Sequence, residues 1–147
     1  MPTIDAQCEL QAAAERIWEL IQDFGNIEAW WPQGGPVRIA RVDVEGQGPG
    51  MVRHIYNEGM PAPVSERLDS LDPPSRLWQL SIVGERPAGL LRYQATGRLQ
   101  PLDAQRCTIS YHGQFEVEPG REDEARQFLE GCYALMFAGL EEAARRG

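Results

Sequence analysis

The sequence contains no lysine, because all 14 of its basic residues are arginine. A Schiff base with a substrate carbonyl needs a lysine amine, so this form of covalent catalysis is excluded, as is a lysine general base. The chain also lacks a basic run, and its formal net charge is −8. Nucleic-acid binding requires a cationic surface, so we expect no nucleic-acid partner.

Long apolar segments are missing as well. No apolar run approaches 18 residues, and the first ten residues lack the pattern of a signal peptide. We therefore expect a cytoplasmic protein with no integral membrane association, either a monomer or a homodimer. The length of 147 residues fits a single domain over 1–147, and a hydrophobic content of 42% is ordinary for a globular chain that buries a core.

Cysteine is scarce, with Cys8, Cys107 and Cys132 far apart and no C-x-x-C spacing. Each occupies an apolar position, which favours reduced core thiols over a disulfide or a metal site. The sequence has no H-E-x-x-H motif, no Ser-His-Asp order and no His/Cys/Asp cluster. We therefore predict neither a metal centre nor a hydrolase site, and we expect no cofactor.

The strongest pattern is a helix at the C-terminal end, over roughly 121–146, whose apolar residues recur at i, i+3, i+4 and i+7. At 1.5 Å per residue it spans about 40 Å, and no second long helix is available to cover its apolar face. Apolar patterns and turn residues predict the preceding elements: a strand at 3–10, helices at 12–24 and 27–31, and strands at 37–45, 51–57, 64–71, 77–83, 90–99 and 107–117.

Short turns between successive strands, including one at 101–105, predict antiparallel pairing. The expected fold is therefore α+β, with a curved seven-stranded antiparallel sheet around the long C-terminal helix. The predicted element order is β-α-α-β-β-β-β-β-β-α.

The third and fourth predicted strands form a hairpin whose register follows from the sequence. A turn at 58–61 pairs Arg53 with Glu66 and Ile55 with Val64. Residues two apart on a strand share a face, and this face is the more apolar of the two, so we predict that it points toward the long helix. An arginine and a glutamate then oppose each other on an otherwise apolar surface.

Alternation along the later strands predicts further inward residues. They are Trp78, Leu80, Ile82, Leu91, Tyr93, Ala95, Ile109, Tyr111, Gly113, Phe115 and Val117. The two histidines, His54 and His112, fall on the solvent-facing side of their strands. That position argues against either histidine as a general base for chemistry inside the protein.

The order of the predicted elements and two segments of the sequence resemble a known group of proteins. The run AERIWELIQDF at 14–24 and the stretch 50–72, with GMVR, EGMPA and SERLDSLD, resemble the START-like superfamily. This superfamily is also called SRPBCC or Bet v 1-like, and the match is to its polyketide cyclase/dehydrase branch. Within it, the stretch 50–72 and the segment 80–85 are similar to plant abscisic acid receptors. The resemblance covers nearly the whole chain.

The resemblance implies a helix-grip fold, in which the sheet and the last helix enclose a cavity for a hydrophobic ligand. It implies that Phe128, Cys132, Met136 and Leu140 lie on the side of the last helix that faces this cavity. Trp31 stands where the receptors hold a ligand carboxylate with a lysine, which argues against abscisic acid as the ligand. The loop at 59–63 matches their gate loop, so we expect it to close over the cavity.

Combining both lines of reasoning, we predict eleven ligand-contacting residues: Arg53, Glu66, Tyr93, Tyr111, Trp31, Ile55, Leu80, Phe115, Phe128, Cys132 and Met136. Arg53 and Glu66 either hold a ligand carbonyl or hydroxyl, or form a partly buried ion pair that fixes strand register. Tyr93 and Tyr111 each bring a hydroxyl that needs a partner when buried. The larger aromatic set could equally fill the core: Trp30, Trp31, Trp78, Tyr93, Tyr111, Phe115, Phe128 and Tyr133.

Three functions remain open from the sequence. The main prediction is binding or carriage of a hydrophobic small molecule. The second is a cofactor-independent enzyme of the polyketide cyclase/aromatase or dehydratase type, in which Arg53, Glu66 and tyrosines move protons. The third is an interaction module whose cavity is mostly filled by side chains. An open apolar cavity with an ion-paired Glu66 favours the first.

Overall fold

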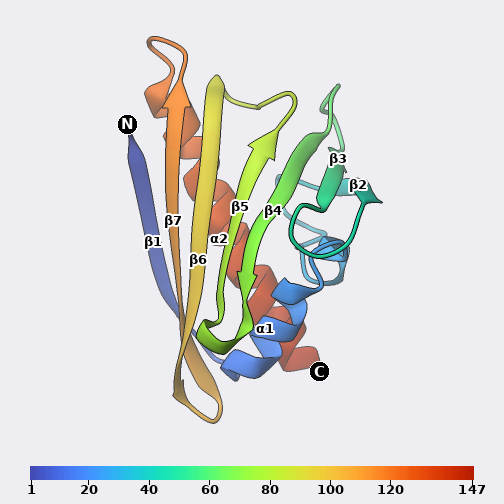
Figure 1. The fold of residues 1–147 in the computed structure, drawn as a ribbon, viewed down its shortest axis with the longest axis vertical. Coiled ribbons are helices and arrows are strands. Elements are labelled where there is room, and N and C mark those ends of the chain that lie inside the picture. The colour runs from blue at the N-terminus through green and yellow to red at the C-terminus, as the bar shows by residue number, and fades with distance from the viewer.

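One curved antiparallel sheet holds a long helix across one of its faces (Figure 1). A computed structural model describes residues 1–147. The strands are β1 (Thr3–Leu10), β2 (Ile39–Glu45), β3 (Val52–Asn57), β4 (Val64–Asp72), β5 (Leu77–Val83), β6 (Leu90–Asp103) and β7 (Arg106–Val117). They are ordered β1-β7-β6-β5-β4-β3-β2 in the sheet. The predicted fold class is confirmed, with seven strands and the predicted order of elements.

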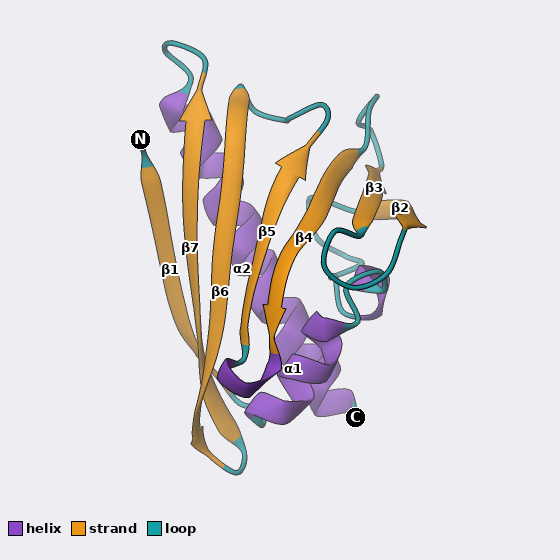
Figure 2. Cartoon of the chain, viewed as in Figure 1, coloured by secondary structure: helices purple, strands orange, loops and turns teal.

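The helices gather on one side of the sheet (Figure 2). They are α1 (Ala14–Gln22), α2 (Glu122–Arg146), and the 3₁₀ helices η1 (Ile27–Ala29) and η2 (Pro73–Ser75). In Figure 1, α2 runs diagonally behind the strands, and α1 lies beside its C-terminal end. Three acidic residues occupy the first turn of α2 and two arginines its last turn, which suits the helix dipole at both ends. No helix combines the length and apolar character needed to cross a membrane.

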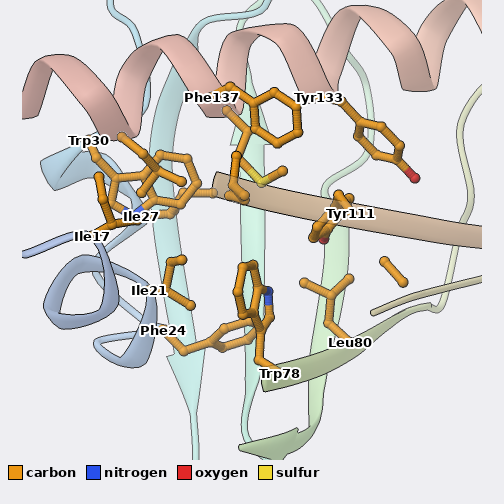
Figure 3. Packing of buried hydrophobic residues seen from close by; sticks show 14 of the residues in the cluster. Ile17, Ile21, Phe24, Ile27, Trp30, Trp78, Leu80, Tyr111, Tyr133 and Phe137 are labelled. Carbon is orange, nitrogen blue, oxygen red and sulfur yellow. The ribbon is translucent and has the colours of Figure 1, made fainter. Parts of the chain in front are cut away.

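The core fills the space between α2 and the sheet (Figure 3). From α1, Ile17 and Ile21 are buried, while Tyr133, Phe137 and Leu140 are buried along α2. Removing each large apolar side chain from water stabilises the fold by about 1.5–3 kcal/mol. The apolar face predicted for the last helix therefore supplies much of the core.

Irregular pairing at several points accompanies the curvature of the sheet. The register shifts between Ile39 and Arg41 on β2, between Leu68 and Ser70 on β4, and at two places on β6. An extra residue on one strand bends it and increases its twist. The sheet can therefore wrap around α2.

Two predictions for β6 are wrong, and both errors come from these irregularities. The register shift between Leu90 and Arg92 turns Leu91 outward, where it is 48% exposed, and Leu90 takes the inward place. The turn predicted at 101–105 is shorter, since β6 continues to Asp103. Pro101 is accommodated because the pairing is irregular there, and the Asp103 carboxylate accepts a hydrogen bond from the Gln105 backbone N–H at 2.8 Å.

Glycine at position 97 makes room for a large ring. Gly97 pairs with Trp78 across β5 and β6, and a Cβ at Gly97 would overlap the Trp78 indole. The indole also packs on Trp18 of α1, with ring centres 6.2 Å apart. The absence of a side chain at Gly97 thus lets Trp78 join the sheet to α1.

We predict that Gly97→Ala lowers the free energy of unfolding by about 1–3 kcal/mol, because the indole must move in a packed core. Gly131→Ala is the matched control: Gly131 lies exposed within α2, and an added Cβ meets no atom. Alanine there should stabilise by about 0.5–1 kcal/mol. Urea unfolding of both variants measures the contrast, and equal effects at the two glycines would contradict it.

Candidate ligand-binding site

A cavity lies between the middle of α2, the segment after α1 and the concave face of the sheet. Its volume is about 90 Å³, which holds only a few water molecules. Of its 18 lining residues, 15 are hydrophobic. One side of α2 contributes Phe128, Leu129, Cys132, Tyr133 and Met136, the spacing of a single helix face.

Arg53 and Glu66 form the charged part of the wall and face each other on β3 and β4, in the predicted register. Arg53 Nε and Nη2 lie 2.8 and 2.7 Å from Glu66 Oε1. Arg53 Nη1 donates to the Phe24 carbonyl at 3.0 Å, and the guanidinium lies 3.9 Å from the centre of the Phe24 ring. The Arg53 side chain is only 8% exposed and the Glu66 side chain 17%. Each charge is therefore largely removed from water, and the opposite charge of its partner offsets the lost hydration.

The second carboxylate oxygen of Glu66 remains open. Both contacts from Arg53 end on Oε1. Every fully buried side-chain nitrogen and oxygen in the protein has a hydrogen-bond partner. Oε2 has no such partner and is therefore not fully buried, and the residue that carries it lines the cavity. Oε2 is therefore an acceptor without a protein donor, on a residue that lines the cavity.

Three tyrosines bring hydroxyls to the same cavity. The hydroxyls of Tyr93 and Tyr133 hydrogen-bond at 2.5 Å, and the rings of Tyr111 and Tyr133 meet edge to face at 4.8 Å. Tyr133 reaches this place because Gly113 has no side chain, since a Cβ there would overlap its hydroxyl. In Figure 3, Tyr133 extends from α2, and Tyr111 lies between Tyr133 and Leu80.

Burial keeps these groups protonated. Loss of solvation is the main cause that raises the pKa of Tyr93 and of Tyr111 well above 10.0, and the charge of Glu66 adds to it. Burial also raises the pKa of Tyr133, and with Glu66 it raises the pKa of Cys132 to about 12. At neutral pH these side chains can form hydrogen bonds as neutral groups but cannot act as general bases.

Nine of the eleven predicted residues line the cavity: Arg53, Glu66, Tyr93, Tyr111, Trp31, Ile55, Phe128, Cys132 and Met136. The structure does not bring Leu80 and Phe115 to it. Leu80 is 2% exposed and lies on the far side of Tyr111 from α2 in the view of Figure 3. Phe115 is fully buried, and the Arg126 guanidinium lies over its ring at 5.4 Å. Trp78 is also absent from the wall, because it packs against Gly97.

Other wall residues were not among the predicted ligand contacts: Ile27, Trp30, Val37, Ile39, Asn57, Val64, Ile82, Leu129 and Tyr133. Apart from the aromatic residues, Asn57 is the only polar residue of this group, and its side chain carries no charge. It shares strand parity with Arg53 and Ile55, so alternation along β3 could have found it.

The two histidines lie away from the cavity wall, in agreement with the predicted outward face. His54 Nδ1 is 2.7 Å from Ser65 Oγ, and Nε2 is 3.0 Å from Glu45 Oε1. The pairing of β3 with β4 explains the contact between these two residues, since it places His54 directly opposite Ser65. Ser65 is 7% exposed, which denies a substrate carbonyl access to its hydroxyl. His112 pairs with Asp5.

The curved sheet, the long helix across it and the cavity between them define a helix-grip protein with an internal binding site. Residues 1–145 match the profile of the family described as polyketide cyclase / dehydrase and lipid transport, and the chain belongs to this family. The predicted START-like superfamily is thereby confirmed. No functionally curated protein matches the sequence.

Solved structures of low sequence identity share the fold. Norcoclaurine synthase from Thalictrum flavum is 18% identical, with a TM-score of 0.79 over 99% of this chain and 87% of that one. Protein XoxI from Bacillus cereus is 22% identical, with a TM-score of 0.82 over 99% and 96%. The Zhui aromatase/cyclase from Streptomyces sp. R1128 is 23% identical, with a TM-score of 0.74 over 99% and 94%. These similarities concern the fold alone.

We predict that Arg53→Leu lowers the free energy of unfolding by about 3 kcal/mol, because Glu66 keeps a mostly buried carboxylate without its partner. The double variant Arg53→Leu/Glu66→Leu should recover most of this loss, since it leaves no lone charge. Urea unfolding of the single and double variants gives the coupling between the two side chains. Losses that simply add would show that the pair is not coupled.

Stability should also fall at alkaline pH. In the unfolded chain thiols ionise near pH 9.0 and phenols near 10.0, whereas the folded chain keeps these protons to higher pH, up to about 12 for Cys132. At alkaline pH the unfolded state therefore binds fewer protons than the folded state. The stability that these groups contribute is complete below pH 9.0 and is lost as the pH rises toward their pKa values in the folded protein. Each group contributes a decrease of up to ~1.4 kcal/mol per pH unit.

Urea unfolding at about pH 8 and about pH 10.5 tests this dependence. Cys132→Ala removes one of the shifted groups without adding bulk, so the stability of this variant should fall less steeply with pH. An unfolding midpoint independent of pH over this range would contradict the assignment.

Proposed function

We propose that the protein binds or carries a hydrophobic small molecule in the cavity beneath α2. The observation that carries this proposal is a mainly apolar cavity whose only two ionised residues, Arg53 and Glu66, are paired with each other. Apolar walls with a few convergent polar groups are the usual design of small-molecule sites, where the polar groups orient the ligand. Membership of a family that includes lipid transport supports the same function.

The proposed entrance is the loop at 59–63, which we expect to act as a gate. Residues 60–63 and residues 85–87 of the β5–β6 loop line a hollow of about 220 Å³. Val64 lines both this hollow and the cavity. Val64 is thus shared by the two spaces, and movement of the loop at 59–63 would join them and admit a ligand without unfolding α2.

A cofactor-independent cyclase or dehydratase is the second candidate. The observation in its favour is that Glu66 and three tyrosines line one cavity, and the family description includes cyclases and dehydrases. Against it, the tyrosines and Cys132 stay protonated at neutral pH, and Glu66 is held by Arg53. Binding without turnover needs none of these groups to exchange a proton, so we rank it first.

We further propose that the protein acts in the cytoplasm, as a monomer or homodimer. Its three cysteines, Cys8, Cys107 and Cys132, are all free thiols, the state that a reducing compartment maintains.

Native mass spectrometry of the protein purified from its own host tests the binding function, followed by solvent extraction of anything bound. We expect a co-purifying apolar molecule, or saturable uptake of the small neutral two-ring dye 1-naphthylamine by the empty protein. Cys132→Phe should abolish dye uptake by filling the cavity, at a cost of about 1–3 kcal/mol in stability. Gly131→Ala, on the exposed side of the same helix, should leave uptake unchanged.

Two results would speak against binding. One is a clean protein mass together with no dye uptake. The other is dye uptake that survives Cys132→Phe in a folded variant, because the dye would then occupy another surface. Chemical conversion of an extracted molecule on incubation with fresh protein would favour the enzyme instead.

A further inference from the structure

We propose that the ligand is a neutral compound of one or two rings that carries a hydroxyl group, and that Glu66 Oε2 accepts the hydrogen of this hydroxyl. This inference rests on the proposed binding function and adds the chemical class of the ligand. It follows from three properties of the cavity: the balance of its charges, its one open carboxylate oxygen and its size.

The balance of charge excludes an anionic ligand. Arg53 is the only cationic residue in the wall. Its guanidinium is already engaged by Glu66 Oε1, by the Phe24 carbonyl and by the Phe24 ring. A carboxylate ligand would lose its hydration, find no free cation and lie beside the Glu66 charge. Fatty acids and other carboxylates are therefore poor candidates.

The open oxygen selects a hydrogen-bond donor. A carboxylate oxygen can only accept, and an O–H···O⁻ hydrogen bond is among the stronger ones available in a protein. A ligand that presents only ether or carbonyl oxygens would leave Oε2 without a partner once water is displaced. An ammonium group would satisfy Oε2, but the Glu66 charge is already balanced by Arg53, so a second cation would be buried uncompensated.

The size and the walls select small rings. The volume of about 90 Å³ is well below the roughly 300–1,000 Å³ of typical ligand pockets. Aromatic side chains make up much of the wall, including Trp30 and Trp31, whose ring centres lie 6.0 Å apart. Flat rings pack against such walls face to face or edge to face. One or two fused rings fit with side-chain adjustment, whereas a longer polycyclic molecule needs the gate loop to move.

Equilibrium dialysis with three naphthalene compounds tests the inference. 2-Naphthalenemethanol and 2-methoxynaphthalene are isomers, so they match in size, and only the first has a donor. 2-Naphthoate has the same rings and a negative charge. We expect the alcohol to bind about tenfold more tightly than its isomer, the factor that corresponds to one hydrogen bond to a charged group, and the naphthoate to bind most weakly.

Glu66→Gln provides the matched variant, since it keeps the side-chain shape and removes the negative charge. The alcohol should lose most of its advantage over the ether. Naphthoate should gain affinity, because the Arg53 charge is no longer balanced. Circular dichroism and thermal unfolding of the variant establish that it is folded.

Equal binding of the two isomers by the wild-type protein, or naphthoate as the tightest of the three, would overturn this inference and leave hydrophobic binding intact. Unchanged selectivity in a folded Glu66→Gln variant would do the same, because the selecting group would then be another one. A different result would falsify the proposed function itself: no binding of any of the three compounds, no co-purifying molecule and no dye uptake.

Discussion

Burial of one apolar helix face governs this structure. α2 has 25 residues, and no other long helix is available to cover it. Only the sheet can do so, and a flat sheet would touch a cylinder along a single line. Register shifts on β2, β4 and β6 bend the strands, and glycines at 97 and 113 let large rings lie close to the sheet. The cavity is the space that this wrapping leaves unfilled.

The role of the Arg53–Glu66 pair follows from the way the sheet wraps around α2. A buried ion pair contributes little net stability, because desolvation offsets most of the attraction between the charges. This pair does connect three elements, since Arg53 also binds the carbonyl of Phe24 just beyond α1. It connects the hairpin of β3 and β4 to the end of α1, and both of its residues line the cavity. The positioning of these three elements therefore explains the pair better than net stability does.

Local periodicity was sufficient to predict most of this arrangement. The spacing of apolar residues predicted α2, and alternation along one hairpin placed Arg53 opposite Glu66. Alternation fails where a strand contains an extra residue, which is why Leu91 was assigned to the wrong face. Alternation also predicts the face of the sheet to which a side chain points, but it does not predict how deeply that side chain is covered. Leu80 and Phe115 do point inward, yet neighbouring side chains cover them, and only the packed structure shows which inward residues reach the cavity.

The resemblance to a family contributed a different kind of information. Nothing in the spacing of residues predicts a cavity, because a helix on a sheet can equally be packed solid. The family resemblance implied one, and the small volume shows that this chain comes near to the filled alternative. Cavity size and lining, which set specificity, depend on the sum of many side-chain volumes and vary within one fold.

The pKa values of the residues in the cavity wall bear on whether these residues can transfer protons to a bound molecule. Proton transfer is efficient when the pKa of a catalytic group lies near the working pH. Burial raises the pKa of the Tyr93 and Tyr111 phenols and of the Cys132 thiol, which takes these pKa values further from neutral pH. The same burial strengthens the hydrogen bonds that these neutral groups make, because no water competes for them. A wall of protonated hydroxyls and one neutralised ion pair can orient a bound molecule through hydrogen bonds, without any of these groups giving up a proton.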